Sequence, residues 1–534
     1  MTLPRMTPEL AKQLSLAEQH EWFRRATSRR ALLRGGLVGA GALAAGPALL
    51  GGTADAATGG AGSATVSAPA LAASLDYAPG STVIPFGRHI AFGADPTSQM
   101  AVAWQVPTAV RNPFIRIGTS PVDLGERIDA EVRALTIPLS DVTSIDNVPA
   151  SAPSAVDQYY LHATLRNLRP GETYYYAVGH DGYDVTRQTL GTNLGSFTTA
   201  PNRREPFTFT AFGDQGVTYD AVATENLVLA QQPAFHLVAG DICYAESHGY
   251  GLLTDAFDPR VWDAYFNQIA PAASSVPWQM GVGNHEMEPW YSPDGYGGQF
   301  ARFDFPLQNQ TYYSFTYGNV AFISLDGNDL SYEMPANRGY TGGAQTAWLE
   351  RQLASIRTPG IDFVVVYFHY CAYSTCANNG SEGGIRDEWT PLFDQYGVDL
   401  VINGHNHIYE RTDPIRGGAA TGAAPIGSTV HPETAGTTYV VVGGAGESLH
   451  KFSVADSYEG SVDDITGIAA YVNEASGEVP ETVSWSRVRY TGYCILRIDS
   501  EPASHGGTSN LIVRGIDEYG NEIDRVVLAR KAAG

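Results

Sequence analysis

Cysteine is scarce in this chain of 534 residues, which has four: Cys243, Cys371, Cys376 and Cys494. No two of them have the CxxC spacing, so the sequence does not indicate a zinc finger. In an oxidising compartment Cys371 and Cys376 can close a small loop as a disulfide, or both can stay reduced. Cys243 and Cys494 are expected to be buried thiols.

Positive charge is also in short supply. The chain has 33 Lys and Arg against 56 Asp and Glu, a net charge of −23 at pH 7. The first 56 residues carry seven basic and four acidic side chains, a net +3, so the rest of the chain carries −26. Such an acidic body repels polyanions, and nucleic-acid binding is not expected. An anionic substrate would need local compensation, which a cluster of metal cations provides.

A long apolar run suited to a stable membrane anchor is missing as well. The stretch after Arg29-Arg30 is weakly apolar, rich in Gly and Ala, interrupted by Pro47, and ends at Ala54-Asp55-Ala56. This order predicts a twin-arginine signal peptide over residues 1–56, and therefore export to the periplasm, the cell surface or the medium. Residues 57–76 are rich in Ala, Ser, Gly and Thr and are expected to be a flexible linker.

After the linker the chain shows two successive patterns of apolar residues, which indicates two folded domains. Apolar residues make up 43% of the chain and charged residues 17%, as in packed globular proteins. Residues 77–200 show short alternating apolar runs separated by turn residues, which predicts an all-β domain. Within it, LRNLRPGETYYYAVG (residues 165–179) has the leucine, proline and tyrosine spacing common in fibronectin type III sandwiches. This domain has no titratable cluster, so a supporting role is expected.

Residues 201–534 alternate apolar strand-like runs with helical segments, which predicts a layered α/β domain with buried strands. The runs are FTFTAF, AFHLVA, VPWQMGV, DFVVVYF and VDLVIN, and the helical segments include TAWLERQLASI and EWTPLFDQYG. Functional sites in such domains are built from the loops at the carboxyl ends of the strands. Side chains directly after these runs are therefore the candidates for chemistry.

Metal-ligand side chains follow five of the strand-like runs. An Asp or a His after one strand is usually structural, but five coincidences in one β/α series indicate a common site. Oxygen donors mixed with imidazole suit hard or borderline ions, and two ions about 3.5–4 Å apart form the phosphoryl-transfer arrangement. The candidate metal ligands are Asp214, Asp241, Tyr244, Asn284, His369, His405 and His407.

The motifs GDxG, GDxxY, GNHE, VxxH and GHxHxYER occur here in that order. In this order they resemble the purple acid phosphatase branch of the dinuclear metallophosphoesterases, from about Tyr77 to the C-terminus. The resemblance implies an α/β fold, with a metallophosphoesterase β-sandwich flanked by helices after a fibronectin type III-like domain. It implies iron(III) held by Asp214, Asp241, Tyr244 and His407. It also implies a divalent iron, zinc or manganese ion held by Asp241 (bridging), Asn284, His369 and His405.

The resemblance further implies a hydrolase of small phosphate monoesters that uses a metal-bound hydroxide. His285 is expected to contact the phosphate or to protonate the leaving group. Glu246 either orients His285 or is a solvated loop carboxylate. Asn378 and Asn379 stand where plant-type enzymes have a His-His pair, and an amide cannot act as an acid.

Three questions stay open at this point. A phosphodiesterase or phospholipase-type activity is the alternative within enzymes, and a secreted binding protein with an inactive scaffold is the alternative outside them. His248 is either a substitute acid or a surface residue. The oligomeric state is not indicated by the sequence. Apart from these questions, we expect a structural role for the residues that follow the HxH pair. They are Tyr409, Glu410 and Arg411, and they should anchor its loop.

Overall fold

The structure is a computed structural model, and it describes residues 82–138, 155–184, 194–253, 255–307, 310–452, 465–504 and 506–533. The predicted signal peptide over residues 1–56 and the linker over residues 57–76 lie outside the described residues. Among the helices that are described, none has the length and apolar character needed to cross a membrane.

The N-terminal domain is a sandwich of two four-stranded antiparallel sheets. Its Tyr174 hydroxyl accepts a hydrogen bond from the Arg169 amide at 2.9 Å, a tyrosine corner of the kind found in such sandwiches. One sheet has the order β1 (Phe86–Phe92), β2 (Met100–Val106), β6 (Ala155–Leu165), β5 (Glu131–Pro138), and the other β4 (Glu126–Asp129), β3 (Phe114–Gly118), β7 (Thr173–Gly179), β8 (Gly195–Thr198).

The second domain contains two seven-stranded mixed sheets, here called the catalytic sheets because the sequence places the expected site at their strand ends. The first catalytic sheet has the order β11 (Trp278–Met280), β10 (Phe235–Val238), β9 (Phe207–Phe212), β25 (Cys494–Glu501), β26 (Thr508–Asp517), β27 (Glu522–Lys531), β20 (Thr429–Val430). The second catalytic sheet has the order β12 (Tyr313–Tyr317), β13 (Val320–Ser324), β14 (Phe363–Phe368), β16 (Leu400–Asn403), β21 (Thr438–Val442), β17 (Tyr409–Thr412), β24 (Ser486–Tyr490). Strands β9, β10 and β11 are parallel, as are β13, β14, β16 and β21.

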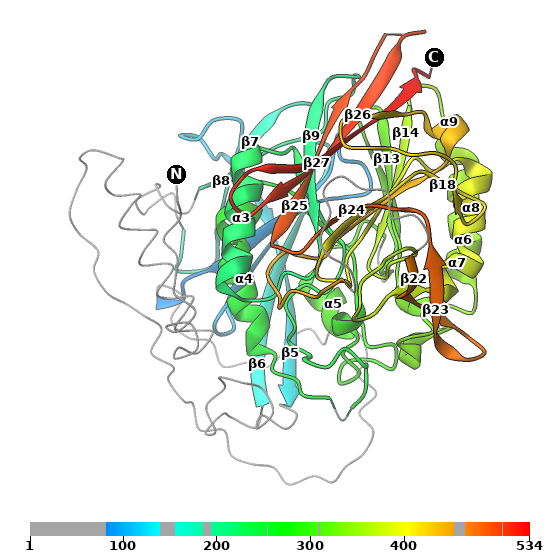
Figure 1. Cartoon of the computed structure of the whole chain (residues 1–534). Coiled ribbons are helices and arrows are strands. Elements are labelled where there is room, and N and C mark those ends of the chain that lie inside the picture. Colours follow the sequence, from blue (N-terminus) through cyan, green and yellow to red (C-terminus); the bar gives the residue numbers. More distant parts are fainter. Residues whose placement is uncertain are drawn as a thin grey trace.

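The two catalytic sheets form the centre of the molecule, and helices cover their outer sides (Figure 1). Strand β14 shows why its sequence is a continuous apolar run. Val365 and Tyr367 join the core between the sheets, while Val364 and Val366 join a separate core beneath the helices. Both faces are buried, as expected for a central parallel strand. The predicted α/β class with an all-β first domain is confirmed.

Helices α3 (Tyr219–Gln231) and α4 (Arg260–Ala273) lie on the first-sheet side, and α6 (Ala344–Ile356), α7 (Gly383–Glu388) and α8 (Thr390–Tyr396) lie on the second-sheet side. The EWTPLFDQYG segment is helical as its spacing predicts, except for a break at Trp389 between α7 and α8. The break coincides with Pro391 in the first turn of α8, where proline has no amide hydrogen to continue the preceding helix.

Smaller elements surround the strand ends. They are α5 (Gly297–Arg302), α9 (Pro432–Ala435), the 3₁₀ helices η4 (Asn284–Glu286), η5 (Gly327–Asp329) and η6 (Pro335–Asn337), the pair β18 (Ile415–Arg416) and β19 (Ala419–Ala420), and a sheet of β15 (Ser381–Glu382), β22 (Ile465–Asn473) and β23 (Gly477–Val483).

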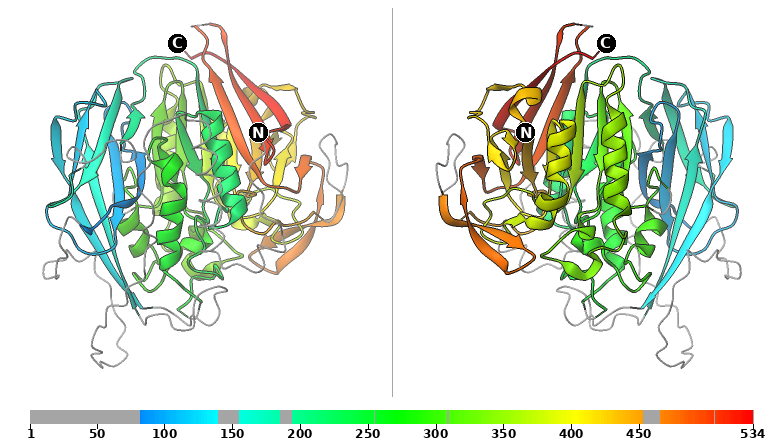
Figure 2. Two further views of the ribbon diagram at one scale, coloured as in Figure 1. Left: turned by 90° about the vertical axis from the view of Figure 1, so that its left-hand side faces the viewer. Right: turned by 90° about the vertical axis from the view of Figure 1, so that its right-hand side faces the viewer.

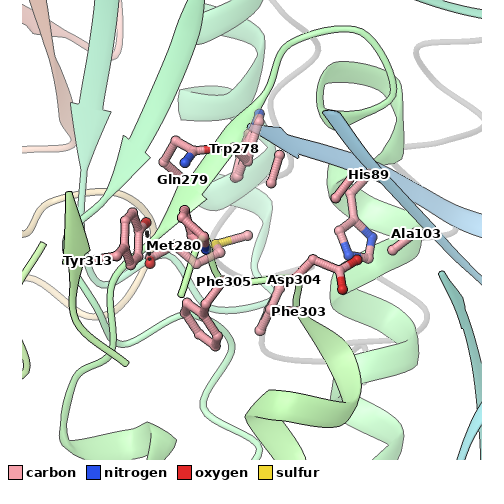
Figure 3. A pocket seen from close by; sticks show the side chains of 12 residues that line it. His89, Ala103, Trp278, Gln279, Met280, Phe303, Asp304, Phe305 and Tyr313 are labelled. Atoms are coloured by element: carbon pink, nitrogen blue, oxygen red, sulfur yellow. Dashed lines mark hydrogen bonds between the residues drawn. The ribbon is translucent and has the colours of Figure 1, made fainter. Parts of the chain in front are cut away.

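The N-terminal domain lies to one side of the catalytic strands (Figure 2). Its contact with them is specific: the Phe92 amide donates to Gln279 Oε1 at 2.6 Å. One cavity at this contact, of about 10 Å³, is lined by residues that include His89, Trp278 and Gln279 (Figure 3). That volume is about the space of one water molecule, so the interface is closely packed.

Asp304 forms the main charged contact across the interface. Its carboxylate meets His162 Nδ1 at 2.7 Å and Arg133 Nη2 at 2.7 Å, and the His162 side chain is 1% exposed. Burial raises the pKa of Asp304, but the charges and hydrogen bonds of His162 and Arg133 outweigh burial and hold the pKa well below its usual range. Ionised Asp304 therefore stabilises the fold above the usual aspartate pKa of about 4, and this contribution is lost as the pH falls below it.

We predict that Asp304→Ala lowers the free energy of unfolding by about 3 kcal/mol at pH 7, because it removes a carboxylate from the Arg133 guanidinium and leaves the buried Nδ1 of His162 without its hydrogen-bond partner. Urea unfolding followed by tryptophan fluorescence measures this, and the difference from the parent protein should shrink at pH 3. Asp129→Ala is the control, because Asp129 pairs with Arg127 at the surface and its side chain is 85% exposed. Equal losses for both variants would contradict the prediction.

Candidate metal centre

The carboxyl ends of the parallel strands of both catalytic sheets meet at one place. Loops of the first catalytic sheet bring four oxygen donors there: Asp214 after β9, Asp241 and Tyr244 after β10, and Asn284 after β11. Loops of the second bring three imidazoles: His369 after β14, and His405 and His407 after β16. The seven side chains predicted from the sequence are therefore together, and each sheet provides one type of donor.

The tyrosine cluster consists of Asp214, Tyr244 and His407. Tyr244 Oη lies 3.1 Å from His407 Nε2 and donates to Asp214 Oδ1 at 3.3 Å. His407 Nε2 lies 3.3 Å from the same Asp214 oxygen. Three potential ligand atoms thus point at one small volume.

The asparagine cluster consists of Asp241, Asn284, His369 and His405. His369 Nε2 lies 3.0 Å from Asp241 Oδ2, 3.0 Å from Asn284 Oδ1 and 3.1 Å from His405 Nδ1. The His405 amide donates to Asp214 Oδ2 at 2.8 Å, which joins this cluster to the tyrosine cluster. Ligand atoms of four side chains again converge, and His405 and His407 belong to different clusters.

The backbone at the site is strained. In the described residues seven non-glycine residues have positive φ, and four of them are cluster members: Asp214 (62°), Asp241 (49°), Tyr244 (59°) and His405 (67°). Such conformations cost about 1–3 kcal/mol each and concentrate at functional sites. They turn each side chain sharply out of its strand.

Glycine permits the close approach of these loops at two positions in particular. A Cβ atom on Gly283 would collide with Asp241 Oδ1, and one on Gly404 would lie 2.6 Å from Asp214 Oδ2. Any larger residue at either position would push a cluster carboxylate aside. The Gly of GNHE and of GHNH is therefore required by space at the carboxylates.

The ring orientation of three histidines is fixed by main-chain carbonyls. Nδ1 of His369 faces Ala239 O at 2.9 Å, Nδ1 of His407 faces Ser448 O at 2.7 Å, and Nδ1 of His285 faces Glu246 O at 2.6 Å. Each Nδ1 therefore carries a hydrogen, which leaves Nε2 as the ring atom that can bind a cation. This is the support that metal-ligating histidines commonly have.

His405 has the opposite orientation, with Nδ1 toward the cluster. Its Nε2 lies 3.0 Å from Glu333 Oε2, and its ring packs on Tyr370 at 4.7 Å between centroids. Sequence reasoning missed Glu333, because the segment around it carries no recognisable motif. The loop before η6 brings it to the site only in the folded structure.

Glu286 is the other residue that sequence reasoning missed. Its buried carboxylate accepts the amides of Asp241 (2.8 Å), Ile242 (2.8 Å) and Gly283 (2.7 Å). One side chain therefore fixes the loops after β10 and β11 relative to each other. Its place as the last residue of GNHE was the available signal.

Electrostatics keeps the Tyr244 phenol protonated without a cation. Burial, then the charges of Asp214 and Asp241, raise its pKa well above the usual value. A bound cation has the opposite effect and lowers the pKa of the phenol, because its charge stabilises the phenolate and the carboxylates together. The two clusters thus form a concentrated site of negative charge that suits cations.

The predicted catalytic residues fall into two groups. His285 belongs to the site: its ring packs on Tyr244 at 4.3 Å, and Nε2 lies 3.9 Å from Asp241 Oδ2. Glu246 does orient His285, but through its carbonyl oxygen. Its carboxylate is fully buried and accepts the amides of His248 and Gly249, so it is not a solvated group. The side chain of His248 is 45% exposed.

The two asparagines contact the backbone of neighbouring loops. Asn379 Nδ2 donates to His405 O at 3.2 Å, and exposed Asn378 accepts the Lys451 amide at 3.3 Å. Asn379 therefore supports the HxH loop directly. In these contacts neither side chain is directed at a ligand atom of the clusters.

Residues after the HxH pair anchor its loop. The Tyr409 hydroxyl donates to Asp524 at 2.8 Å and Arg411 pairs with the same carboxylate at 2.6 Å. Glu410 points the other way and accepts from Ser374 and Thr375 at 3.0 and 2.8 Å. All four cysteines are buried free thiols, so of the two alternatives for Cys371 and Cys376 the structure has the reduced pair.

We predict that Glu286→Gln lowers the free energy of unfolding by about 2–4 kcal/mol, because the amide presents a donor to a buried N–H that needs an acceptor. Thermal unfolding followed by circular dichroism checks this in metal-free protein. Glu388→Gln, at an exposed position of α7, is the matched control and should leave the midpoint unchanged. An unchanged midpoint for Glu286→Gln would show that the three amide contacts contribute little.

Comparisons with known proteins agree with this geometry. The family model of the purple acid phosphatase N-terminal domain matches residues 85–199, and that of calcineurin-like phosphoesterases matches residues 207–409. Two uncharacterized proteins of Mycobacterium tuberculosis are each 34% identical over 464 residues, which cover 80% of this chain and 82% of theirs. Purple acid phosphatase 18 of Arabidopsis thaliana is 25% identical, and the matched region covers 66% of this chain and 71% of that protein.

Among solved structures, the purple acid phosphatase PPD1 from yellow lupin (Lupinus luteus) seeds is similar in fold. Its TM-score is 0.61 at 22% identity, with 84% of this chain and 74% of that chain covered. Together with the two family models, this likeness extends over both the N-terminal sandwich and the catalytic sheets. The chain therefore belongs to the purple acid phosphatase family of metallophosphoesterases, and it is a phosphoric ester hydrolase.

Proposed function

We propose that this protein hydrolyses small phosphate monoesters and holds iron(III) together with a divalent iron, zinc or manganese ion. The observation that carries the proposal is the division of seven ligand-type side chains into two joined clusters with different donors. A single-metal enzyme has no need for the second set of ligand atoms.

The donor chemistry of each cluster fits one of the two ions. Phenolic and carboxylic oxygens in the tyrosine cluster suit hard iron(III), and the two imidazoles of the asparagine cluster suit a borderline divalent ion. Asp241 is the candidate bridge. It lies against His369 in one cluster, and its charge raises the pKa of Tyr244 in the other.

The chain also fixes the amide of Asn284. Its Nδ2 donates to Gly249 O at 3.2 Å, so Oδ1 is the atom turned toward His369 and the cluster. An amide that was free to flip would present hydrogens to a cation half of the time. When bound, the two ions supply the positive charge that attracts the phosphate and the Lewis acidity that activates water.

His285 is the candidate proton donor to the leaving group. Its Nδ1 is fixed on the Glu246 carbonyl, so Nε2 is the atom that gains and loses a proton beside the clusters. Burial lowers the pKa of His285, and a bound phosphate anion acts in the opposite direction. Asn378 and Asn379 cannot take this role, because an amide is far too weak an acid to release a proton to the leaving group.

We predict that the protein purified with its native metals contains about two ions per chain and turns over p-nitrophenyl phosphate at least tenfold faster than bis(p-nitrophenyl) phosphate. Elemental analysis and steady-state rates on the same sample provide the test. A clear preference for the diester would replace the monoesterase assignment by a phosphodiesterase. Absence of bound metal and of activity after reconstitution would instead favour an inactive scaffold.

We also predict a visible absorption band that depends on Tyr244, from charge transfer between its phenolate and iron(III). Tyr244→Phe should abolish the band, and it removes one ligand to the ion. Tyr250→Phe is the matched control, since Tyr250 lies six residues away with its side chain 52% exposed. A band that survives in Tyr244→Phe would refute the assignment of this ligand.

A further inference from the structure

Large hydrophobic side chains are exposed at one concentrated place beside the candidate metal centre. In the described residues six such side chains are exposed, and three of them lie within four consecutive positions: Tyr250 (52%), Leu252 (50%) and Leu253 (67%). The other three, Ile84, Val122 and Tyr519, are far apart in the sequence. Single exposed apolar residues are ordinary, whereas a group of them marks an interaction site.

The segment that carries this group, here called the apolar tip, is Tyr250–Leu253. It closes a loop whose base is held on both sides. Glu246 and Phe257 form a β-bridge, and the Ser247 amide donates to Ala256 O at 3.1 Å. At the tip, the Leu252 amide donates to Asp255 Oδ2 at 2.7 Å. The loop therefore presents its leucines from a braced backbone.

The loop crosses the edge of the site. Gly249 accepts from Asn284 Nδ2, and a Cβ atom on Gly249 would lie 2.9 Å from His285 Nε2. Gly251 packs between Met287 and Ala336, with an added Cβ 3.1 and 3.2 Å from their Cβ atoms. Gly249 directly precedes the apolar tip, Met287 lies two residues after His285, and Ala336 lies three residues after Glu333. The apolar tip therefore lies beside the His285 and Glu333 segments.

Charge at the site selects against an anionic leaving group. Glu333 is 20% exposed beside His405, and Glu447 is partly exposed next to His407. These carboxylates repel a second negative group on the substrate, while an uncharged apolar group meets no such penalty. The apolar tip adds favourable contact for that group on the side of His285, where a leaving group is protonated.

We propose that Tyr250, Leu252 and Leu253 bind the uncharged apolar alcohol part of the phosphate ester, which makes apolar monoesters the preferred substrates. The inference rests on the proposed function and names its substrate class. Partial burial of four additional methylene groups against this surface should favour n-hexyl phosphate over ethyl phosphate about tenfold in kcat/KM. The two esters have leaving groups of similar chemistry, so the comparison isolates binding.

The test uses the metal-loaded protein and the variant Leu252→Ser/Leu253→Ser. We expect kcat/KM for n-hexyl phosphate to fall about fivefold, because Tyr250 remains, and that for ethyl phosphate to stay within twofold. Val122→Ser is the control, because Val122 is 85% exposed in the N-terminal domain. Equal losses for both esters, or no loss for either, would overturn the proposal. Tyr250→Ser is a single-residue variant that should reproduce part of the effect.

Binding measurements separate this inference from the proposed function. Calorimetry with n-hexylphosphonate and ethylphosphonate should show about tenfold tighter binding of the hexyl compound to the parent protein. In the double variant, which keeps Tyr250, the difference should shrink to about twofold. If neither ester is hydrolysed, the proposed function fails, and the phosphonate affinities still decide about the apolar tip. Equal affinities of the parent protein for the two phosphonates would overturn the inference about the apolar tip.

Discussion

The hydrogen bond from the His405 amide to the Asp214 carboxylate connects the two catalytic sheets where the site is built. Asp214 belongs to the first sheet and His405 to the second, and each has positive φ at the exit from its strand. Their glycine neighbours Gly213 and Gly404 approach so closely that a Cβ on the first would lie 3.0 Å from the Cα of the second. Since one sheet supplies the oxygen donors and the other the imidazoles, the centre depends on this contact and on others between the sheets, such as that of His369 with the Ala239 carbonyl.

Much of the support around the clusters comes from the main chain. Carbonyl oxygens orient His285, His369 and His407, while amides of the β10 and β11 loops converge on buried Glu286. A main-chain acceptor is fixed by the fold and has no rotamers to lose, so it positions a ring at little entropic cost. The same reasoning explains why Glu246 acts on His285 through its carbonyl while its carboxylate closes its own loop.

The acidic composition and the chemistry of the site belong together. A body with an excess of carboxylates attracts cations and repels polyanions, and the clusters concentrate this tendency at one point. The phosphate group is then recognised through bound ions, which leaves the edge of the site for the rest of the substrate. There the apolar tip and the Glu333 carboxylate lie beside His285 and His405, and they favour an uncharged partner.

The sequence by itself determined the strands, the ligand-type residues at their ends and the family, because buried parallel strands read as continuous apolar runs and the motifs are local. It also located the anchoring role of Tyr409, Glu410 and Arg411. Only the tertiary structure decided the distances and ring orientations within each cluster, that Glu333 holds His405, and that Glu286 joins two loops. Those contacts link residues tens to hundreds of positions apart, and their partners are set by how the two sheets pack, which no local pattern encodes.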